Sequence, residues 1–130
     1  KALRFLTKKK YYIFIVTNQA GIAKGKFKER DFINLHSKIK TLLSDKKIYI
    51  DQVEYCPHHP KAKIKKFRKK CSCRKPGDLM IRKILKKWNI NLEKSFMIGD
   101  QIKDKLAAEK SGIKFQFVKD DLFKQVNQIT

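Results

Sequence analysis

The sequence predicts an α/β fold, in which a parallel sheet is flanked by helices. Short apolar segments rich in β-forming residues alternate with helical patterns, and this alternation is typical of βαβ units. Two of the apolar segments end abruptly in polar residues, Thr17-Asn18-Gln19 and Gly99-Asp100-Gln101. Ligands bind at the carboxyl ends of the strands in such sheets, so we expect both segments to border one crevice.

In the first half of the chain, residues 1–7 resemble a helix entered partway along. Residues 12–16 form a continuous apolar run, which predicts a central parallel strand buried on both faces. A helix is expected next, because apolar residues recur every three or four positions at Phe32, Leu35, Ile39, Leu42 and Leu43. Residues 48–55 predict a short strand.

The second half begins with a basic loop, residues 56–76, that contains all three cysteines. Asp78 is expected to cap a helix whose apolar stripe is Ile81, Ile84, Leu85 and Trp88. Residues 95–98 and 115–118 predict two further strands, and the helix between them, 103–111, is expected to end with Gly112 just beyond it. With no repeat and no Gly/Ser linker, residues 1–130 are interpreted as one domain.

Charge dominates the composition. The chain has 33 Lys+Arg against 12 Asp+Glu, for a formal net charge of +21. However, only five of the basic residues are Arg, the residue that proteins recruit for bidentate recognition of phosphates and bases. The lysines are also spread along the chain, so we interpret the charge mainly as solvated surface and expect no specific nucleic-acid partner. Attraction to nucleic acid or to polyphosphorylated small molecules remains an alternative.

No apolar run approaches the ~20 residues of a membrane span, and we expect a cytoplasmic monomer.

The three cysteines belong to a metal-ligand pattern. Cys56-Pro57-His58 and Cys71-Ser72-Cys73 offer three thiolates and one imidazole, the four ligands of a closed structural zinc site. His59 is a possible substitute for His58, although the spacing favours His58. A loop of this length has no apolar core of its own, so a metal would stabilise it.

A second group of residues suits phosphate chemistry. Asp100 follows a strand and could ligate Mg²⁺. Asp104 could ligate the metal as well, hold one of the metal's ligands in place by a hydrogen bond, or cap the next helix. Thr17 offers a hydroxyl to a phosphoryl oxygen. Lys75 offers a compact positive charge, and Arg74 can clamp a second anionic group.

The order of these motifs resembles the zinc-loop phosphatases of the haloacid dehalogenase superfamily. The resemblance rests on Val16-Thr17-Asn18-Gln19-Ala20-Gly21, on Cys56-Pro57-His58-His59-Pro60, on Cys71-Ser72-Cys73-Arg74-Lys75-Pro76 and on Gly99-Asp100 through Asp104. It covers nearly the whole chain, and the zinc loop joined to Arg-Lys-Pro is its most specific part.

The resemblance implies a Rossmannoid core and Mg²⁺-dependent hydrolysis of a phosphomonoester through an aspartyl phosphate. Thr17 would bind the transferring phosphoryl group, Lys75 would neutralise it, and Asp100 would ligate Mg²⁺. Asn18 and Arg74 would contact the substrate. The implied substrate is a sugar bisphosphate that loses its 7-phosphate, heptose 1,7-bisphosphate of the ADP-heptose branch of lipopolysaccharide synthesis. Histidinol phosphate, an intermediate of histidine biosynthesis, is the alternative.

The sequence also departs from the family. The Asp-x-Asp-Gly motif, which would supply the nucleophile and the acid/base, is absent, and no Asp-x-Asp occurs anywhere in the chain. We therefore expect an incomplete domain that lacks the first strand, and no turnover by these 130 residues alone. A catalytically dead, zinc-stabilised binding module is a further alternative. Asp78-Leu79 stands where the family usually has Pro and Gly, and Gln101 stands where a Lys is common.

Overall fold

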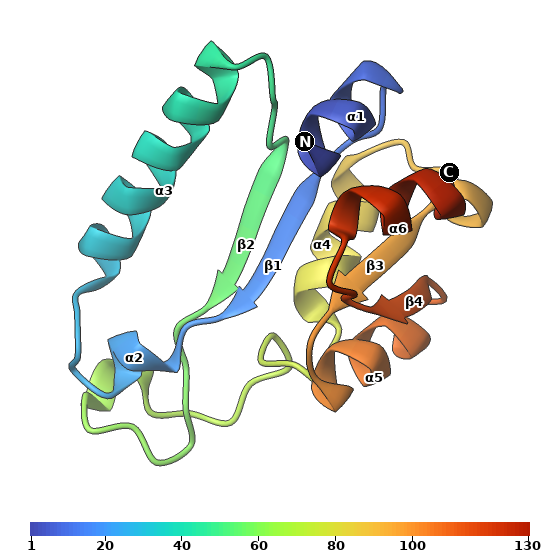
Figure 1. Cartoon of the computed structure of the whole chain (residues 1–130). Helices are drawn as coiled ribbons and strands as arrows, with labels where there is room; N and C mark the ends of the chain where they lie inside the picture. The colour runs from blue at the N-terminus through green and yellow to red at the C-terminus, as the bar shows by residue number, and fades with distance from the viewer.

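The computed structural model describes all of residues 1–130 (Figure 1). The first half of the chain contains α1 (Ala2–Lys8), β1 (Phe14–Asn18), α2 (Ala20–Ala23), α3 (Glu29–Asp45), β2 (Gln52–Cys56) and the short 3₁₀ helix η1 (Lys65–Phe67). The second half contains α4 (Leu79–Lys87), the 3₁₀ helix η2 (Leu92–Lys94), β3 (Phe96–Gly99), α5 (Ile102–Lys110), β4 (Lys114–Phe117) and α6 (Leu122–Ile129). The predicted α/β class is confirmed.

The strands form two separate parallel pairs. β1 pairs with β2, from Phe14 opposite Gln52 to Asn18 opposite Cys56. β3 pairs with β4, from Phe96 opposite Lys114 to Gly99 opposite Phe117. Each pair is a two-stranded sheet of its own, and no strand joins them. Figure 1 shows β1 and β3 as the inner strands of the two pairs, with their arrowheads at the same end.

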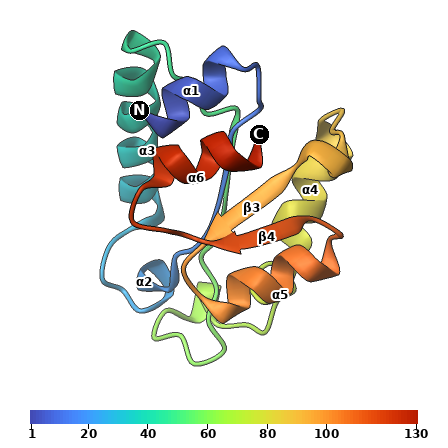
Figure 2. The same cartoon turned by 45° about the vertical axis from the view of Figure 1, so that its right-hand side comes forward.

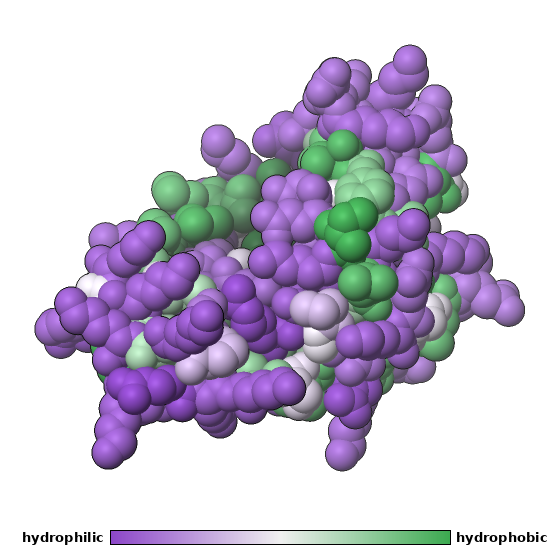
Figure 3. Space-filling view, turned by 90° about the horizontal axis from the view of Figure 1, so that it is seen from below, coloured by the Kyte–Doolittle hydropathy of each residue, from purple (hydrophilic) through white to green (hydrophobic).

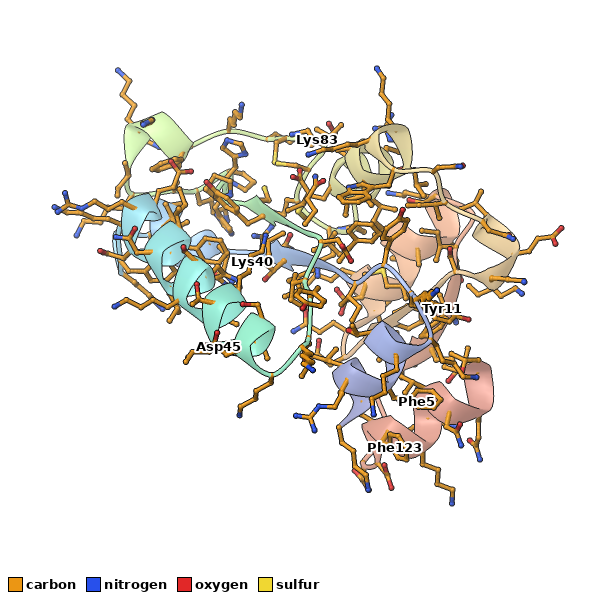
Figure 4. All side chains as sticks on the ribbon, turned by 90° about the horizontal axis from the view of Figure 1, so that it is seen from above. Phe5, Tyr11, Lys40, Asp45, Lys83 and Phe123 are labelled. Carbon is orange, nitrogen blue, oxygen red and sulfur yellow. The ribbon has the colours of Figure 1, made fainter.

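Helices hold the two sheets in place. α4 packs on β2, α5 packs on β3 and β4, and α1 and α6 pack against each other (Figures 1 and 2). Phe5 of α1 and Phe123 of α6 meet edge to face with ring centroids 5.4 Å apart (Figure 4). No helix is both long and apolar enough to cross a membrane.

The core is small, with 20 of 130 residues buried. Its main cluster joins the two helices at the chain ends to the start of β1 through Ala2, Leu6, Ile13, Ile50 and Val126. Every residue of β1 and of β3 is only half-buried. The prediction of a strand buried on both faces is therefore wrong for β1, because one of its two edges has no neighbouring strand.

Several element boundaries also differ from the predictions. β1 begins at Phe14 and runs through Asn18, so Thr17 lies within the strand rather than after it. The stripe on α3 is only partly covered: Phe32 is buried, whereas the exposed fractions of Leu35 and Leu42 are 55% and 64%. Figure 1 shows why, since α3 stands apart from the sheet beside it.

Two predicted helix ends had different outcomes. Asp78 occupies the position before α4, but its side chain caps no backbone N–H and instead accepts a hydrogen bond from Arg82 Nε at 3.0 Å. Gly112 follows α5 with φ +74°, the left-handed conformation expected of a glycine at that position.

Candidate phosphoryl site and metal site

Lys75 lies at the centre of the first candidate site, where β1 and β3 end. Its backbone N–H donates to Asn18 Oδ1 at 2.9 Å, and Asn18 Nδ2 donates to the Lys75 carbonyl at 3.3 Å. Its ammonium group donates to the Val16 carbonyl of β1 at 3.3 Å and to Asp104 Oδ1 of α5 at 2.6 Å. Lys75 therefore bridges the carboxyl ends of the two separate sheets.

Asp104 is the buried partner of this lysine, with 6% of its side chain exposed. Its second carboxylate oxygen accepts from the backbone N–H groups of Asp100 and Gln101, at 3.2 and 3.0 Å, so it caps α5. Burial raises its pKa, but the hydrogen bond from Lys75 and the one from the Gln101 N–H outweigh burial, and the pKa lies below its ordinary value. Of the three roles considered for Asp104, the structure shows capping, through Oδ2, while Oδ1 is engaged by Lys75.

Gly99 permits this arrangement. A Cβ at Gly99 would lie 2.6 Å from the Cβ of Asp104 and 2.7 Å from its Oδ2. Such contacts are too close for any side chain larger than hydrogen, so glycine lets α5 start directly against the end of β3. Asp100, the next residue, is exposed and presents its carboxylate at the same edge.

Thr17 and Asp100 border the same cavity, which has a volume of about 1050 Å³ and lies between β1 and β3. Its rim at the carboxyl ends of the strands is formed by Thr17, Lys75, Asp100 and Asp104. The hydroxyl oxygen of Thr17 accepts a hydrogen bond from Gln19 Nε2 at 3.1 Å, a contact that sequence reasoning missed. Seen from below, the surface around these strand ends is mostly hydrophilic, with a few hydrophobic patches (Figure 3).

Arg74 precedes Lys75, and its guanidinium is partly buried. Its Nη1 is buried without a hydrogen-bond partner. A buried donor without a partner is costly, so this nitrogen is suited to meeting an anion brought by a ligand. Gly77 shapes the turn that follows, because a Cβ there would collide with the carbonyl oxygen of Ser72.

The second candidate site is a cluster of four metal-ligating side chains. One ligand atom each from Cys56, His58, Cys71 and Cys73 lies within 4.8 Å of every other. The Sγ atoms of Cys73 and Cys56 are 2.8 Å apart, and His58 Nδ1 lies 3.3 Å from Cys73 Sγ. Cys56 ends β2, and the other three ligands come from the loop that follows.

Burial shifts the pKa values of two members of this cluster, Cys56 and His58, in opposite directions. It raises the pKa of the Cys56 thiol well above its ordinary value, with the neighbouring Cys73 thiol as a second cause. It lowers the pKa of His58, as does the positive charge of Lys69. Three thiols and a neutral imidazole that converge in a polar loop fit a zinc ion, which would take the thiols as thiolates.

His59 is turned away from the cluster. Its Nδ1 accepts a hydrogen bond from the backbone N–H of Lys61 at 3.0 Å. The four converging ligands include His58 and not His59. This agrees with the prediction from the Cys-x-His spacing, which favoured His58 as the ligand. A cavity of about 760 Å³ borders the cluster, and Lys66, Lys69 and Lys70 contribute positive charge to its wall.

Comparisons with known proteins agree with this geometry. Residues 72–128 match the family model described as HAD-hydrolase-like. The chain is 40% identical over 129 residues to D-glycero-beta-D-manno-heptose-1,7-bisphosphate 7-phosphatase of Rhodopseudomonas palustris, a match that covers 98% of this chain and 72% of the relative. It is 39% identical over 112 residues to the Salmonella typhi protein of the same name, with 86% and 60% covered. Against several such relatives, the matched part spans about 60% of their length.

Among solved structures, the fold matches D,D-heptose 1,7-bisphosphate phosphatase from B. bronchiseptica, complexed with magnesium and phosphate. The TM-score is 0.81 at 25% identity, and the match covers 99% of this chain and 81% of the other.

The fold, the two sites and these matches define the class: the chain belongs to the haloacid-dehalogenase-like phosphatase family. Within that family, its sequence is similar to the heptose-1,7-bisphosphate 7-phosphatases.

Proposed function

We propose that this chain is the greater part of a Mg²⁺-dependent phosphatase that removes the 7-phosphate of D-glycero-D-manno-heptose 1,7-bisphosphate. The observation that carries the proposal is the convergence of Thr17, Lys75 and Asp100 on one cavity rim, beside Arg74 and the cysteine-histidine cluster. The names of the related proteins support the choice of a heptose bisphosphate over histidinol phosphate.

Each residue has a separate task in this proposal. The Thr17 hydroxyl and the Lys75 ammonium would hold the oxygens of the transferring phosphoryl group, and Lys75 would stabilise the negative charge that develops there. Asn18 would fix the position of Lys75 and contact the substrate. Arg74 would bind an anionic group of the substrate with its free Nη1. The lysines of the second cavity would attract the other phosphate.

Magnesium would be held by Asp100, the exposed carboxylate on the rim, together with ligands from outside this chain. When bound, it would neutralise phosphate charge and orient the phosphoryl group for in-line attack. Zinc would be held by Cys56, His58, Cys71 and Cys73, which leave no position open for a reactive water, so its role would be structural.

The attacking carboxylate is proposed to come from outside residues 1–130. The carboxylates at the rim are Asp100 and Asp104, and Asp104 is committed to Lys75 and to two backbone N–H groups. No aspartate pair with the Asp-x-Asp spacing occurs in the sequence. We therefore interpret residues 1–130 as one incomplete domain that does not turn over substrate unaided.

A chimaera tests the proposal. The part of the Rhodopseudomonas palustris relative that lies outside the match would be joined to this chain, and phosphate release from heptose 1,7-bisphosphate and from histidinol phosphate would be measured with Mg²⁺. We expect turnover of the heptose substrate by the chimaera and none by the 130 residues alone. Lys75→Ala in the chimaera should lower kcat by about 100-fold, and the exposed matched control Lys46→Ala should leave it unchanged.

Each other outcome has a definite meaning. Turnover by the 130 residues alone would show that the nucleophile lies within them. Preference for histidinol phosphate would support the alternative substrate, and failure on both substrates by a folded, zinc-loaded chimaera would refute a phosphatase of either kind.

A further inference from the structure

Gln19 lies directly behind Thr17 at the end of β1. Its side-chain Nε2 donates a hydrogen bond to Thr17 Oγ1 at 3.1 Å. Thr17 and Lys75 border the 1050 Å³ cavity, whereas Gln19 is not among the residues that line it. The amide of Gln19 therefore acts on a ligand in that cavity through the threonine hydroxyl and not by direct contact.

The backbone of Gln19 is held on both sides. Its N–H donates to the carbonyl of Cys56, at the end of β2, at 2.8 Å, and its carbonyl accepts from the N–H of Ile22 in α2 at 3.1 Å. Its side chain is half-buried. Figure 1 shows this junction, where β1 runs into α2 beside the end of β2. The amide that reaches Thr17 is thus carried by a fixed point of the fold.

This hydrogen bond restricts the proton of the Thr17 hydroxyl. A hydroxyl has one proton and two lone pairs, and the amide of Gln19 occupies one lone pair, so the proton has to point elsewhere. The acceptor that the chain itself offers is the Asn18 carbonyl, 3.5 Å from Thr17 Oγ1. That distance is longer than the roughly 2.5–3.0 Å of an ordinary O–H···O hydrogen bond. The proton is therefore available to an acceptor that a ligand brings.

Lys75 offers a second donor at the same strand end. An ammonium group has three N–H donors and no acceptor. Two of the three are engaged, by the Val16 carbonyl at 3.3 Å and by Asp104 Oδ1 at 2.6 Å. Val16 immediately precedes Thr17, so the ammonium group lies beside the strand end that carries the threonine. Thr17 and Lys75 thus each retain one donor for a ligand at the rim of the cavity.

We infer that Gln19 is a positioning residue of the proposed phosphoryl site, and that it makes this site favour a phosphoryl group in its fully deprotonated, dianionic form. The inference rests on the proposed function, in which Thr17 and Lys75 hold the phosphoryl oxygens. The dianionic group of a phosphomonoester has three terminal oxygens that only accept hydrogen bonds, so it matches the two donors. The monoanion carries an O–H in place of one of these acceptors, and that O–H cannot pair with a donor.

A double-mutant cycle tests the role of Gln19. The zinc-loaded 130-residue chain is titrated with methyl phosphate in a calorimeter, without added Mg²⁺, at about pH 7.5. Thr17→Val should weaken binding by about 10-fold, because it removes a hydrogen bond to a charged group. Gln19→Leu should weaken binding by about 5-fold. Adding Gln19→Leu to Thr17→Val should cause no further loss beyond about 2-fold, because both changes act through one hydroxyl. Gln128→Leu, on the exposed side of α6, is the matched control and should leave the affinity unchanged.

The dependence of binding on pH supplies a readout that a merely structural glutamine would not change. The charged groups at the rim are Lys75, Asp100 and Asp104, with Arg74 beside them. Sulfate keeps its two charges at mildly acidic pH, so its binding reports the titration of the protein's own groups. Methyl phosphate, with a second pKa of about 6, is mostly protonated at about pH 5. Relative to sulfate, its affinity for the unmutated chain should fall by about 10-fold between about pH 7.5 and pH 5. For Gln19→Leu the fall should not exceed about 3-fold, because the freed hydroxyl can then accept as well as donate.

Additive losses in the cycle would overturn the inference, since Gln19 would then act independently of the hydroxyl. Equal pH profiles for Gln19→Leu and the unmutated chain would overturn it as well. Unchanged binding by Thr17→Val, or no binding of methyl phosphate by the unmutated chain, would refute the inference together with the proposed phosphoryl site. If the cycle and the pH profiles come out as expected while the chimaera shows no turnover, the inference stands and only the phosphatase proposal is refuted.

Discussion

Asn18 holds the backbone of Lys75 at both its N–H and its carbonyl, across a separation of 57 residues in the sequence. The asparagine belongs to β1 and the lysine to the loop that follows the cysteine-histidine cluster. This pair of hydrogen bonds fixes where the lysine stands relative to the strand ends, while its ammonium group remains in contact with Asp104.

Removing the Asn18 amide should loosen this loop. Asn18→Ala deletes both hydrogen bonds to Lys75, and we expect the free energy of unfolding to fall by about 1–2 kcal/mol. Asn18→Asp keeps the acceptor for the Lys75 N–H and loses the donor, so it should lose roughly half as much. Urea denaturation followed by circular dichroism measures both. Equal stability of Asn18→Ala and the unmutated chain would show that the contact contributes nothing.

Asp104 should make stability depend on pH in the acid range. Its pKa is lowered in the folded state, so the folded chain binds this proton less readily than the unfolded chain. The resulting stabilisation is fully present above the ordinary carboxyl pKa near 4 and is lost as the pH falls through the lower folded value. Asp104→Asn should cost about 3 kcal/mol at pH 7, because it leaves the Lys75 ammonium buried without its charge partner.

The difference between the unmutated chain and Asp104→Asn should therefore shrink between pH 5 and pH 2. Asp45→Asn is the matched control, since Asp45 is exposed at the end of α3. Its difference should stay near zero throughout. A constant difference for Asp104→Asn across this range would contradict the prediction.

The two adjacent histidines should differ in their effect on zinc. His58→Ala removes one of four converging ligands and should abolish stoichiometric zinc retention after gel filtration. His59→Ala should retain one zinc per chain, because its Nδ1 accepts from Lys61 instead. Zinc content by atomic absorption, together with Tm before and after chelation, measures both. If His59→Ala lost zinc and His58→Ala kept it, the ligand assignment would be reversed.

The sequence predicted the order and type of the main elements because their patterns are local. Short segments rich in β-forming residues marked the four strands, although β2 begins at Gln52 rather than at Ile48. The spacing of Cys56, His58, Cys71 and Cys73 marked the ligand cluster that the structure brings together. The glycine beyond α5 was also predicted correctly, since φ +74° there depends on a single residue type.

What the sequence could not predict depends on distant parts of the chain. The apolar run that ends at Val16 indicates a central strand, but whether it has two neighbours depends on which other strands are present. The Lys75–Asp104 ion pair likewise joins residues 29 positions apart. Because the chain has so many lysines, the sequence does not show which of them pairs with Asp104. The roles of Thr17, Lys75, Asp100, Asn18 and Arg74 in catalysis remain predictions.

The cysteine-histidine cluster draws its ligands from both ends of one lysine-rich loop. Cys56 and His58 lie before the segment from His59 to Lys70, and Cys71 and Cys73 lie after it. That segment exposes many lysines, so it offers ready cleavage points to trypsin. A cut anywhere within it leaves two ligands on each fragment. The zinc-loaded chain would thus survive nicking as two pieces joined by a shared ion in addition to the packing of α1 on α6 and of α4 on β2, and a chelator would remove one of these links.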